Sequence, residues 1–340
     1  MPNPLLEENT LPPFNAIEPQ QVEPAIRQLI ECSKTRINAL LDEQNTYNWD
    51  TLLAPVEALE DALSQAWSPV SHLNSVCNNE AMRQAYNACL PLLSEYQTWK
   101  GQHEKLCAAY RDIAASPHFS SMNSGVRRAV EKALRDFRLA GVDLSSAEKV
   151  RYGELKKNLS RLGSRFSENV LDATNAWSRL ATREELAGLP ETALASARQA
   201  AEQSGDDGYL INLEFPSLSP VLNYCDNRAL REEIYTAHCT RASQQGPNAG
   251  EWDNSELITE TLELRHQLAQ LLGFEHYADL SLATKMADSP DSVRRFLDEL
   301  AEKSLPQARR EWTELEAYAK QEDGLESLEA WDINYYSEKL

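Results

Sequence analysis

Six histidines and six cysteines are the side chains of this chain that could bind a transition metal, and their spacing decides which could act together. Hydrolysis by a zinc ion held on one helix needs two histidines a helical turn apart, with a glutamate between them that faces the attacking water. The segment HEKLC that begins at His103 comes nearest to this pattern, since cysteine can also bind zinc. It lacks a second histidine and a recognisable third ligand. We therefore interpret it as part of an ordinary surface helix.

The other histidines and the cysteines also lack the spacing of a metal site or a nucleophile. His238 and Cys239 are neighbours, so on a helix their side chains diverge by about 100°. We interpret them as a packed histidine beside a buried thiol. His266 and His276 lie on either side of Gly273 at no ligand spacing. The cysteines form no C-x-x-C pair, and we expect all of them to be reduced packing residues: Cys32, Cys77, Cys89, Cys107, Cys225 and Cys239.

One cluster has residue types that could bind a substrate. Thr284 and Lys285 lie just before a helix expected to start at Pro290, and a lysine with a hydroxyl near a helix start can bind an anion such as a peptide carboxylate. The alternative is structural, with Lys285 paired to one of many acids and Met286 filling core. No serine elbow or glycine-rich phosphate loop is present. The sequence predicts no catalytic residue and no metal ligand, and leaves Thr284 and Lys285 as candidates for substrate binding.

Composition argues against several kinds of partner. The chain has 340 residues, 42% of them hydrophobic, which is ample for a folded core and long enough for two domains. A formal net charge of −20 repels phosphate backbones and anionic lipids, so we expect neither nucleic acid nor a membrane as a partner. The first residues lack a basic segment followed by a long apolar one, and no apolar run reaches membrane-spanning length. We expect a cytoplasmic protein.

The elements that must position these residues are mainly helices. Apolar residues at steps of three and four predict them throughout, and the longest such pattern predicts one long central helix from about Ala147 into the mid-170s. An earlier helix is expected to end before Ser68-Pro69. Another is expected to end at Gly141, because glycine can adopt the left-handed backbone conformation of a helix cap with little strain. Further helical segments are expected around residues 79–110, and the other expected helices span residues 22–41, 52–67, 126–140, 191–203, 228–242, 255–272 and 290–324.

The helical pattern breaks between Ser178 and Tyr224. After the turn at Gly208, alternating apolar residues predict a strand that starts at Tyr209 and is ended by Pro216, with a partner strand near residues 179–182. We expect this segment to join two lobes. The fold class is therefore predicted as mainly α, a multi-helix bundle with a long central helix and a small two-stranded β element.

Residue identity in several blocks is more particular than any helical pattern requires. The most specific block reads RHQLAQLLGFEHYADLSLATKMA at residues 265–287. With the other blocks it resembles the thimet oligopeptidase family of zinc metallopeptidases over essentially the whole chain. Those other blocks are MPNPLLEENTLPPF at the start, SPVSHLNSV at 68–76, VEKALRDF at 130–137, SENVLDATNAW at 167–177 and WDINYYSEK at 331–339.

The resemblance implies the amino-terminal lobe of a largely helical, two-lobed enzyme whose narrow channel admits short peptides. In that family the zinc-binding H-E-x-x-H, a third glutamate ligand and the substrate-binding His and Tyr lie in the second half of the sequence, so no catalytic residue is carried over. The domains implied are an amino-terminal helical domain at 1–177, a strand-containing junction at 178–224, and the start of the peptidase domain at 225–340, truncated before the zinc motif.

Two functions remain open. The first is the amino-terminal portion of a zinc metalloendopeptidase that degrades short peptides. Its chain would form one wall of the substrate channel, bind no zinc, be inactive alone and need the missing carboxy-terminal catalytic half as partner. The second is a free-standing helical module, derived from that family, that binds peptides or another protein. A reading frame that continues past Leu340 to H-E-x-x-H would favour the first.

Overall fold

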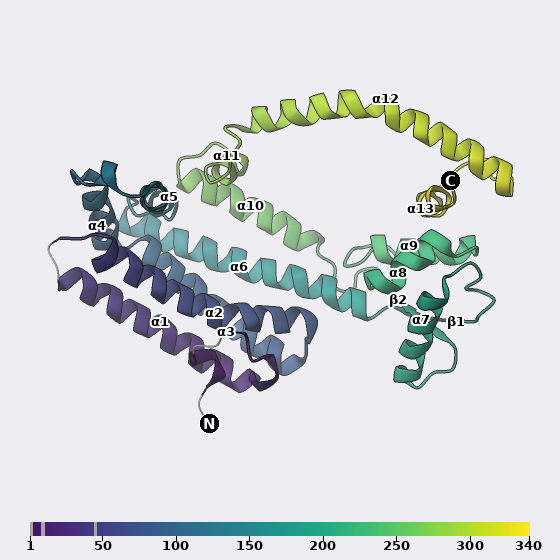
Figure 1. Ribbon diagram of the computed structural model, residues 1–340, viewed down its shortest axis with the longest axis horizontal. Helices are drawn as coiled ribbons and strands as arrows, with labels where there is room; N and C mark the ends of the chain where they lie inside the picture. Colours follow the sequence, from purple (N-terminus) through teal and green to yellow (C-terminus); the bar gives the residue numbers. More distant parts are fainter. Residues whose placement is uncertain (1–2, 8–10, 44–45) are drawn as a thin grey trace. The chain divides into compact units, whose positions relative to one another are not determined.

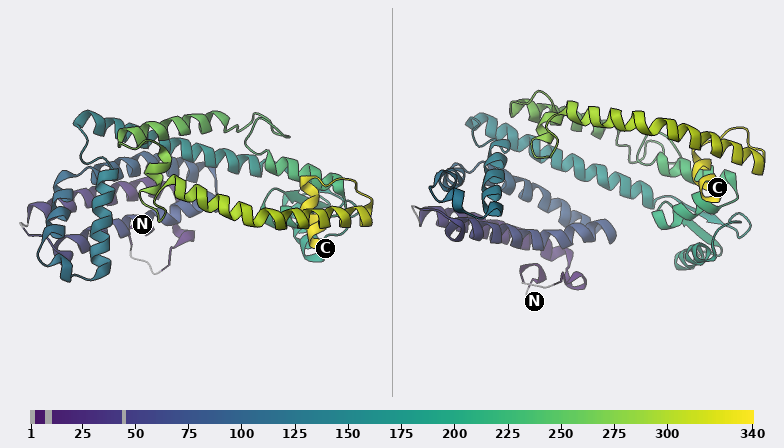
Figure 2. Two further views of the ribbon diagram at one scale, coloured as in Figure 1. Left: turned by 90° about the horizontal axis from the view of Figure 1, so that it is seen from above. Right: turned by 45° about the horizontal axis from the view of Figure 1, so that its top comes forward.

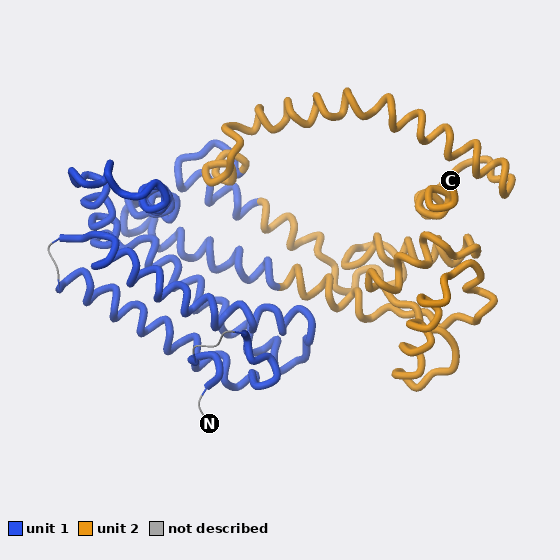
Figure 3. Tube along the Cα trace, viewed as in Figure 1, with its two compact units in different colours: residues 1–164, 263–277 blue, residues 165–262, 278–340 orange. Residues whose placement is uncertain are grey.

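The computed structural model describes residues 3–7, 11–43 and 46–340, and these form two compact units (Figures 1 and 3). Unit 1 consists of residues 1–164 and 263–277, and unit 2 of residues 165–262 and 278–340. This division rests on packing alone, and the domain boundaries expected from the sequence remain a prediction. Within the described residues, no helix is long and apolar enough to cross a membrane.

Unit 1 is a helical bundle in which α1 packs against α2 and α3, and α4 packs against α5. Two apolar cores fill it, one between α1, α2 and α3 and the other centred on α4 and α5. Its elements are η1 (Pro4–Leu6), η2 (Phe14–Ala16), α1 (Pro19–Asp42), η3 (Trp49–Leu53), α2 (Ala54–Val76), α3 (Glu80–Gly101), α4 (Glu104–Ala115), η4 (Phe119–Ser121), α5 (Ser124–Leu139), and parts of α6 (Ser146–Asn175) and α10 (Ser255–Leu271).

The prediction that the second helix ends before Ser68-Pro69 is wrong. Helix α2 continues to Val76 with Pro69 inside it, although an interior proline removes one backbone hydrogen bond and costs about 3 kcal/mol or more. Val70 and Ala66, on either side of the proline, are almost fully buried in the core shared with α1 and α3. Burial of these side chains offsets the cost.

The predicted long central helix is confirmed. Helix α6 has 30 residues, roughly 45 Å at about 1.5 Å per residue, and its sequence passes from unit 1 into unit 2 after Ser164 (Figures 1 and 3). Gly141 follows α5 with a φ of 79°, the left-handed conformation expected at that position.

Unit 2 contains the predicted two-stranded sheet. Strands β1 (Ser178–Ala181) and β2 (Tyr209–Asn212) pair antiparallel, with Ser178 opposite Asn212. The strand was expected to continue to Pro216 but ends at Asn212, because α8 already starts at Phe215 and takes Pro216 into its first turn. The helices α7 (Glu191–Ser204), α8 (Phe215–Tyr224) and α9 (Arg228–Cys239) surround the sheet and share one apolar core.

The remainder of unit 2 contains the short helix α11 (Tyr277–Leu282), the 34-residue helix α12 (Pro290–Asp323) and the last helix, α13 (Ala330–Lys339). Helix α12 is continuous in every view, from its Ser289 cap to the left-handed Gly324 (Figure 2). Helix α13 packs against α8, α9 and the end of α12. A small apolar core of Leu315, Ala319, Leu328, Tyr335 and Tyr336 joins these two helices.

Candidate functional site

The candidate substrate-binding residues Thr284 and Lys285 are both exposed. The ammonium of Lys285 turns back onto α11, where it donates to the backbone oxygen of Ser281 at 2.9 Å and to its hydroxyl at 2.5 Å. At the start of α12, Ser289 accepts from the amide of Ser292, so a side chain already caps that helix end. A role for Lys285 and Thr284 in binding substrate stays a prediction.

The structural alternative for this segment is wrong for Met286. Its side chain is 100% exposed, so it fills no part of a core. Lys285 is held by a serine rather than by the acid that was expected. An exposed methionine beside a lysine held in place by its own helix leaves the segment open to contact with another molecule.

Both ring nitrogens of His103 have partners within the fold. It caps α4, with Nδ1 accepting from the amide of Leu106 at 3.1 Å and Nε2 lying 3.0 Å from Oδ1 of Asn38. Burial lowers its pKa from the ordinary value. Cys107, one turn later, is buried. Glu104 instead forms an ion pair with Lys149 at 2.5 Å. The three side chains therefore stabilise α4 and its contacts with neighbouring elements.

The remaining histidines and cysteines do not converge. His238 is half-buried, but Cys239 is exposed, so the expected buried thiol at this position is wrong. All six cysteines are free as predicted, yet only Cys89, Cys107 and Cys225 are buried packing residues. Within the described ranges there is no group of three or more His, Cys, Asp or Glu that could hold a metal ion.

A buried cluster of charges that the sequence did not predict fixes α13 to α9. Asp332 is fully buried and accepts from two arginines. Arg228 donates through Nε and Nη2 at 3.0 and 2.7 Å, and Arg231 through Nη2 at 2.9 Å. Arg231 is itself 1% exposed and also donates to the backbone oxygen of Cys225 at 2.7 Å. Two cations thus share one buried carboxylate, and each makes geometrically specific bonds.

Aromatic and charged residues of α13 extend this cluster. The guanidinium of Arg231 lies 3.9 Å from the ring centroid of Tyr335, a cation–π contact in a dry setting. The hydroxyl of Tyr335 donates to Asp226 at 2.7 Å, and Lys339 lies 3.3 Å from the same carboxylate. The block at 331–339 that carries part of the family resemblance is therefore the block that holds α13 in place.

Helix α12 has a long exposed stretch with apolar side chains. Every residue from 294 to 314 is exposed. Among them, Phe296, Leu297 and Leu300 are 65%, 54% and 53% exposed and lie at helical steps of one and three residues. Soluble monomers rarely expose a contiguous apolar stripe of this kind, and such stripes mark contact surfaces.

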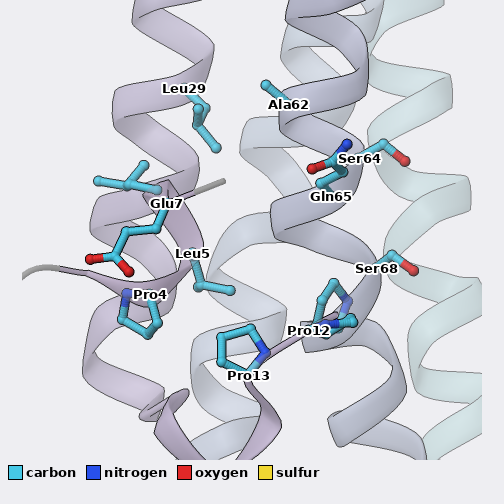
Figure 4. Close-up of a pocket in the computed structure, with 12 residues that line it drawn as sticks. Pro4, Leu5, Glu7, Pro12, Pro13, Leu29, Ala62, Ser64, Gln65 and Ser68 are labelled. Carbon is cyan, nitrogen blue, oxygen red and sulfur yellow. The ribbon is translucent and has the colours of Figure 1, made fainter. Parts of the chain in front are cut away.

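A pocket of about 470 Å³ in unit 1 carries no assignment. Pro4, Leu5 and Pro13 line it together with residues of α1 and α2 such as Leu29 and Ala62 (Figure 4). Residues 8–10, which follow directly on its lining residue Glu7, lie outside the described part of the chain. We therefore propose no ligand for this pocket.

Comparison with known proteins identifies two matching family models. "Peptidase family M3" matches residues 221–340, which include α9 to α13. "Neurolysin/Thimet oligopeptidase, N-terminal domain" matches residues 26–149, which lie in unit 1. The two matches fall on different parts of the chain in the order expected from the resemblance.

Curated relatives match along the full length of this chain. Oligopeptidase A of Salmonella typhimurium and that of Escherichia coli are each 51% identical over 340 residues, which is 100% of this chain and 50% of each relative. Probable cytosolic oligopeptidase A of Arabidopsis thaliana is 34% identical over 348 residues, 99% of this chain and 49% of that protein. The chain thus spans about half the length of the curated relatives it matches. The chain is thus similar over its whole length to about half of an oligopeptidase A, and the peptidase family M3 model matches its residues 221–340.

Proposed function

We propose that this chain is the amino-terminal portion of a zinc metalloendopeptidase that degrades short peptides, and that it supplies one wall of the substrate channel without a catalytic group. The observation that carries the proposal is 51% identity to oligopeptidase A across all 340 residues, with the match covering half of each relative. A peptide aligned along such a wall gains in rate through proximity and orientation rather than through acid–base chemistry. Cytoplasmic location belongs to the same proposal.

Zinc enters the proposal through the family resemblance alone. The described residues do not fit a metal, since they contain no group of three or more potential ligands, and the nitrogens of His103 are engaged within the fold. We therefore route no step of the reaction through a metal held by this chain. In the intact enzyme, the metal and its ligands would come from the half that this chain does not match.

The exposed stripe of α12 supports this assignment. Its apolar residues lie within the segment matched by the peptidase family model, at residues 221–340. We propose that residues equivalent to the unmatched half of the relatives cover Phe296, Leu297 and Leu300 in the intact enzyme. Burying each of these side chains would contribute about 1.5–3 kcal/mol of hydrophobic stabilisation.

The test is a fusion of this chain to the unmatched half of Escherichia coli oligopeptidase A, compared with this chain alone. We expect the fusion to bind one zinc per molecule and to cleave a quenched fluorescent peptide of fewer than about ten residues, with activity lost to a chelator. We expect this chain alone to do neither. Chelator-sensitive cleavage by the chain alone would overturn the proposal.

Two lysine substitutions on opposite faces of α12 provide a matched control for the role of the stripe. Leu297→Lys places a charge in the proposed interface, and we expect at least tenfold lower activity and a lower melting temperature of the fusion. Glu302→Lys introduces the same residue on the exposed polar side and should leave both unchanged. An inactive wild-type fusion, together with saturable binding of unstructured peptides by this chain alone, would favour the binding module instead.

A further inference from the structure

A pocket of about 160 Å³ lies in unit 2, where β2 meets α7 and the start of α8 (Figure 1). It touches both Leu210 and Ile211 of β2. Neighbouring residues of a strand point to opposite faces of the sheet, so a pocket that contacts both of them lies along an edge of the strand. None of the four described residues of β1 lines the pocket, so this edge is the one that faces away from β1.

The backbone of Leu210 is directed toward this edge. In an antiparallel pair, alternate residues direct their amide and carbonyl groups to the partner strand, and the residues between them direct theirs away. The amide of Asn212 donates to the hydroxyl of Ser217 at 3.0 Å, so Asn212 belongs to the second set. On β1, the carbonyl of Leu180 lies opposite Leu210 and accepts from the guanidinium of Arg179, as a carbonyl directed away from β2 can. Leu210 therefore also directs its amide and carbonyl away from β1.

These two backbone groups are the ones that an added strand would bind. No hydrogen bond from α7 or α8 to either group of Leu210 occurs among the described residues. A residue placed opposite Leu210 on a third strand would exchange two backbone hydrogen bonds with it. Edge strands with such unpaired groups are templates for pairing with another chain.

The helical wall of the pocket consists of small side chains. Ala193, Ala197 and Ala200 of α7 line it opposite β2. Sites for drug-sized ligands measure about 300–1,000 Å³, and the smaller volume of this pocket suits one side chain of a longer partner instead. A small apolar side chain fits both the size and the chemistry of this wall.

The charges around the edge favour a basic partner. Asp206 lies in the turn before β2, and Glu214 lines the pocket just after the strand. Both carboxylates are exposed, and neither forms an ion pair with another described residue. Arg198 of α7 is paired with Glu202 at 3.1 Å, and no lysine or arginine is among the described residues that line the pocket. Unpaired carboxylates at both ends of an edge attract cationic side chains.

We propose that the free edge of β2 binds an extended, basic segment of another polypeptide as a third strand. One residue of the segment exchanges two backbone hydrogen bonds with Leu210. A neighbouring residue, whose side chain points to the other face, places a small apolar group against the alanines of α7, and basic residues on either side face Asp206 and Glu214. Backbone bonds then supply affinity, and the pocket and the charges supply selectivity. The proposal concerns binding by this chain alone and does not depend on the peptidase function proposed above.

The experiment titrates this chain into the fluorescein-labelled peptide Lys-Val-Ala-Val-Lys and follows fluorescence anisotropy. One control peptide has its three central amides N-methylated, which removes the donors and blocks strand pairing while the charges stay. The other is Glu-Val-Ala-Val-Glu, which keeps the backbone and reverses the charges. We expect saturable binding of the basic peptide and at least about tenfold weaker binding of each control. No saturable binding of the basic peptide, or equal binding of the N-methylated one, would overturn the proposal.

Variants then test whether binding occurs at this edge. Ala200→Leu fills the pocket, and we expect it to weaken binding of the basic peptide at least about tenfold. Ala195→Leu makes the same change at an exposed position of α7 outside the pocket and should bind like the wild type. Glu214→Gln removes one charge without adding bulk and should weaken binding roughly two- to fivefold, with an unchanged far-ultraviolet circular dichroism spectrum. Wild-type affinity in both Ala200→Leu and Glu214→Gln would show that the peptide binds elsewhere.

Discussion

The two ends of α12 differ in what covers them, although each has a leucine on the same face of the helix. Leu297 and Leu315 are eighteen residues apart, which is about five turns of an α-helix, so they lie on the same face. Leu297 is 54% exposed, whereas Leu315 is 7% exposed because α13 covers it. One apolar stripe is therefore a core at one end and a surface at the other.

This difference shows that amphipathic spacing specifies a contact face but not the partner. At its covered end, α12 meets α13, which is itself held by the buried bonds between Asp332 and the two arginines of α9. At its uncovered end, the same pattern has no such support from the described residues. The stability of the contact between α12 and α13 therefore depends on how firmly the charged cluster holds α13 and on how much the burial of Leu315 contributes.

Breaking the charged cluster should cause the largest loss of stability. In Asp332→Ala, Arg231 would remain almost fully buried without its carboxylate, and a lone buried charge costs about 3–5 kcal/mol. We expect the free energy of unfolding of unit 2 to fall by that amount, and amide exchange of residues 330–339 to accelerate. Urea denaturation and hydrogen exchange measure the two effects.

The matched control is Asp298→Ala, which removes an exposed carboxylate from α12 and should change stability by less than about 0.5 kcal/mol. Similar stabilities for the two variants would mean that the cluster does not hold α13, and the contrast between the ends of α12 would lose its explanation.

Most helices of this fold could be predicted from the sequence, because apolar periodicity and caps act over a few residues. The long helix α6 and both strands followed from such local patterns. The continuation of α2 through Pro69 did not, because it depends on the burial of Val70 against the side chains of two other helices, α1 and α3. Local rules identify a proline as a stop, and tertiary packing overrules it.

The second prediction compares the two leucines directly. Leu315→Ala leaves a cavity between α12 and α13 and should cost about 2–5 kcal/mol, while Leu297→Ala in the isolated chain should cost less than about 0.5 kcal/mol. Both changes remove the same atoms from the same face of one helix. Chemical denaturation of the two variants side by side measures the difference. Equal losses would show that Leu297 already has a partner within this chain.

The candidate sites were harder to predict than the fold. Arg231 and Asp332 are about a hundred positions apart, and nothing local to either one indicates a shared buried bond. At the start of α13, Asp332 also forms a capping box with Glu329, and this local contact gives no sign of the two arginines.

The smallest expected effect is a pH dependence of the same cluster. Burial alone would raise the pKa of Asp332, but hydrogen bonds from Arg228, the amide of Glu329 and Arg231 outweigh it and leave the pKa below its ordinary value of 3.8. Because the folded pKa lies below the unfolded one, the ionised carboxylate stabilises the fold fully above the ordinary value. This contribution is lost as the pH falls through the folded value.

The measurement compares wild type with Asp332→Asn, which keeps the side-chain size and removes the charge. The difference between their free energies of unfolding should be constant from pH 7 down to about pH 5 and should shrink below about pH 4, because only the wild type has this carboxylate to protonate. Other acids titrate in both proteins and cancel in the difference. A difference that does not change with pH would mean that Asp332 acts through its hydrogen-bond geometry alone. The contact between α12 and α13 would then be stabilised by apolar packing and not by the charge of Asp332.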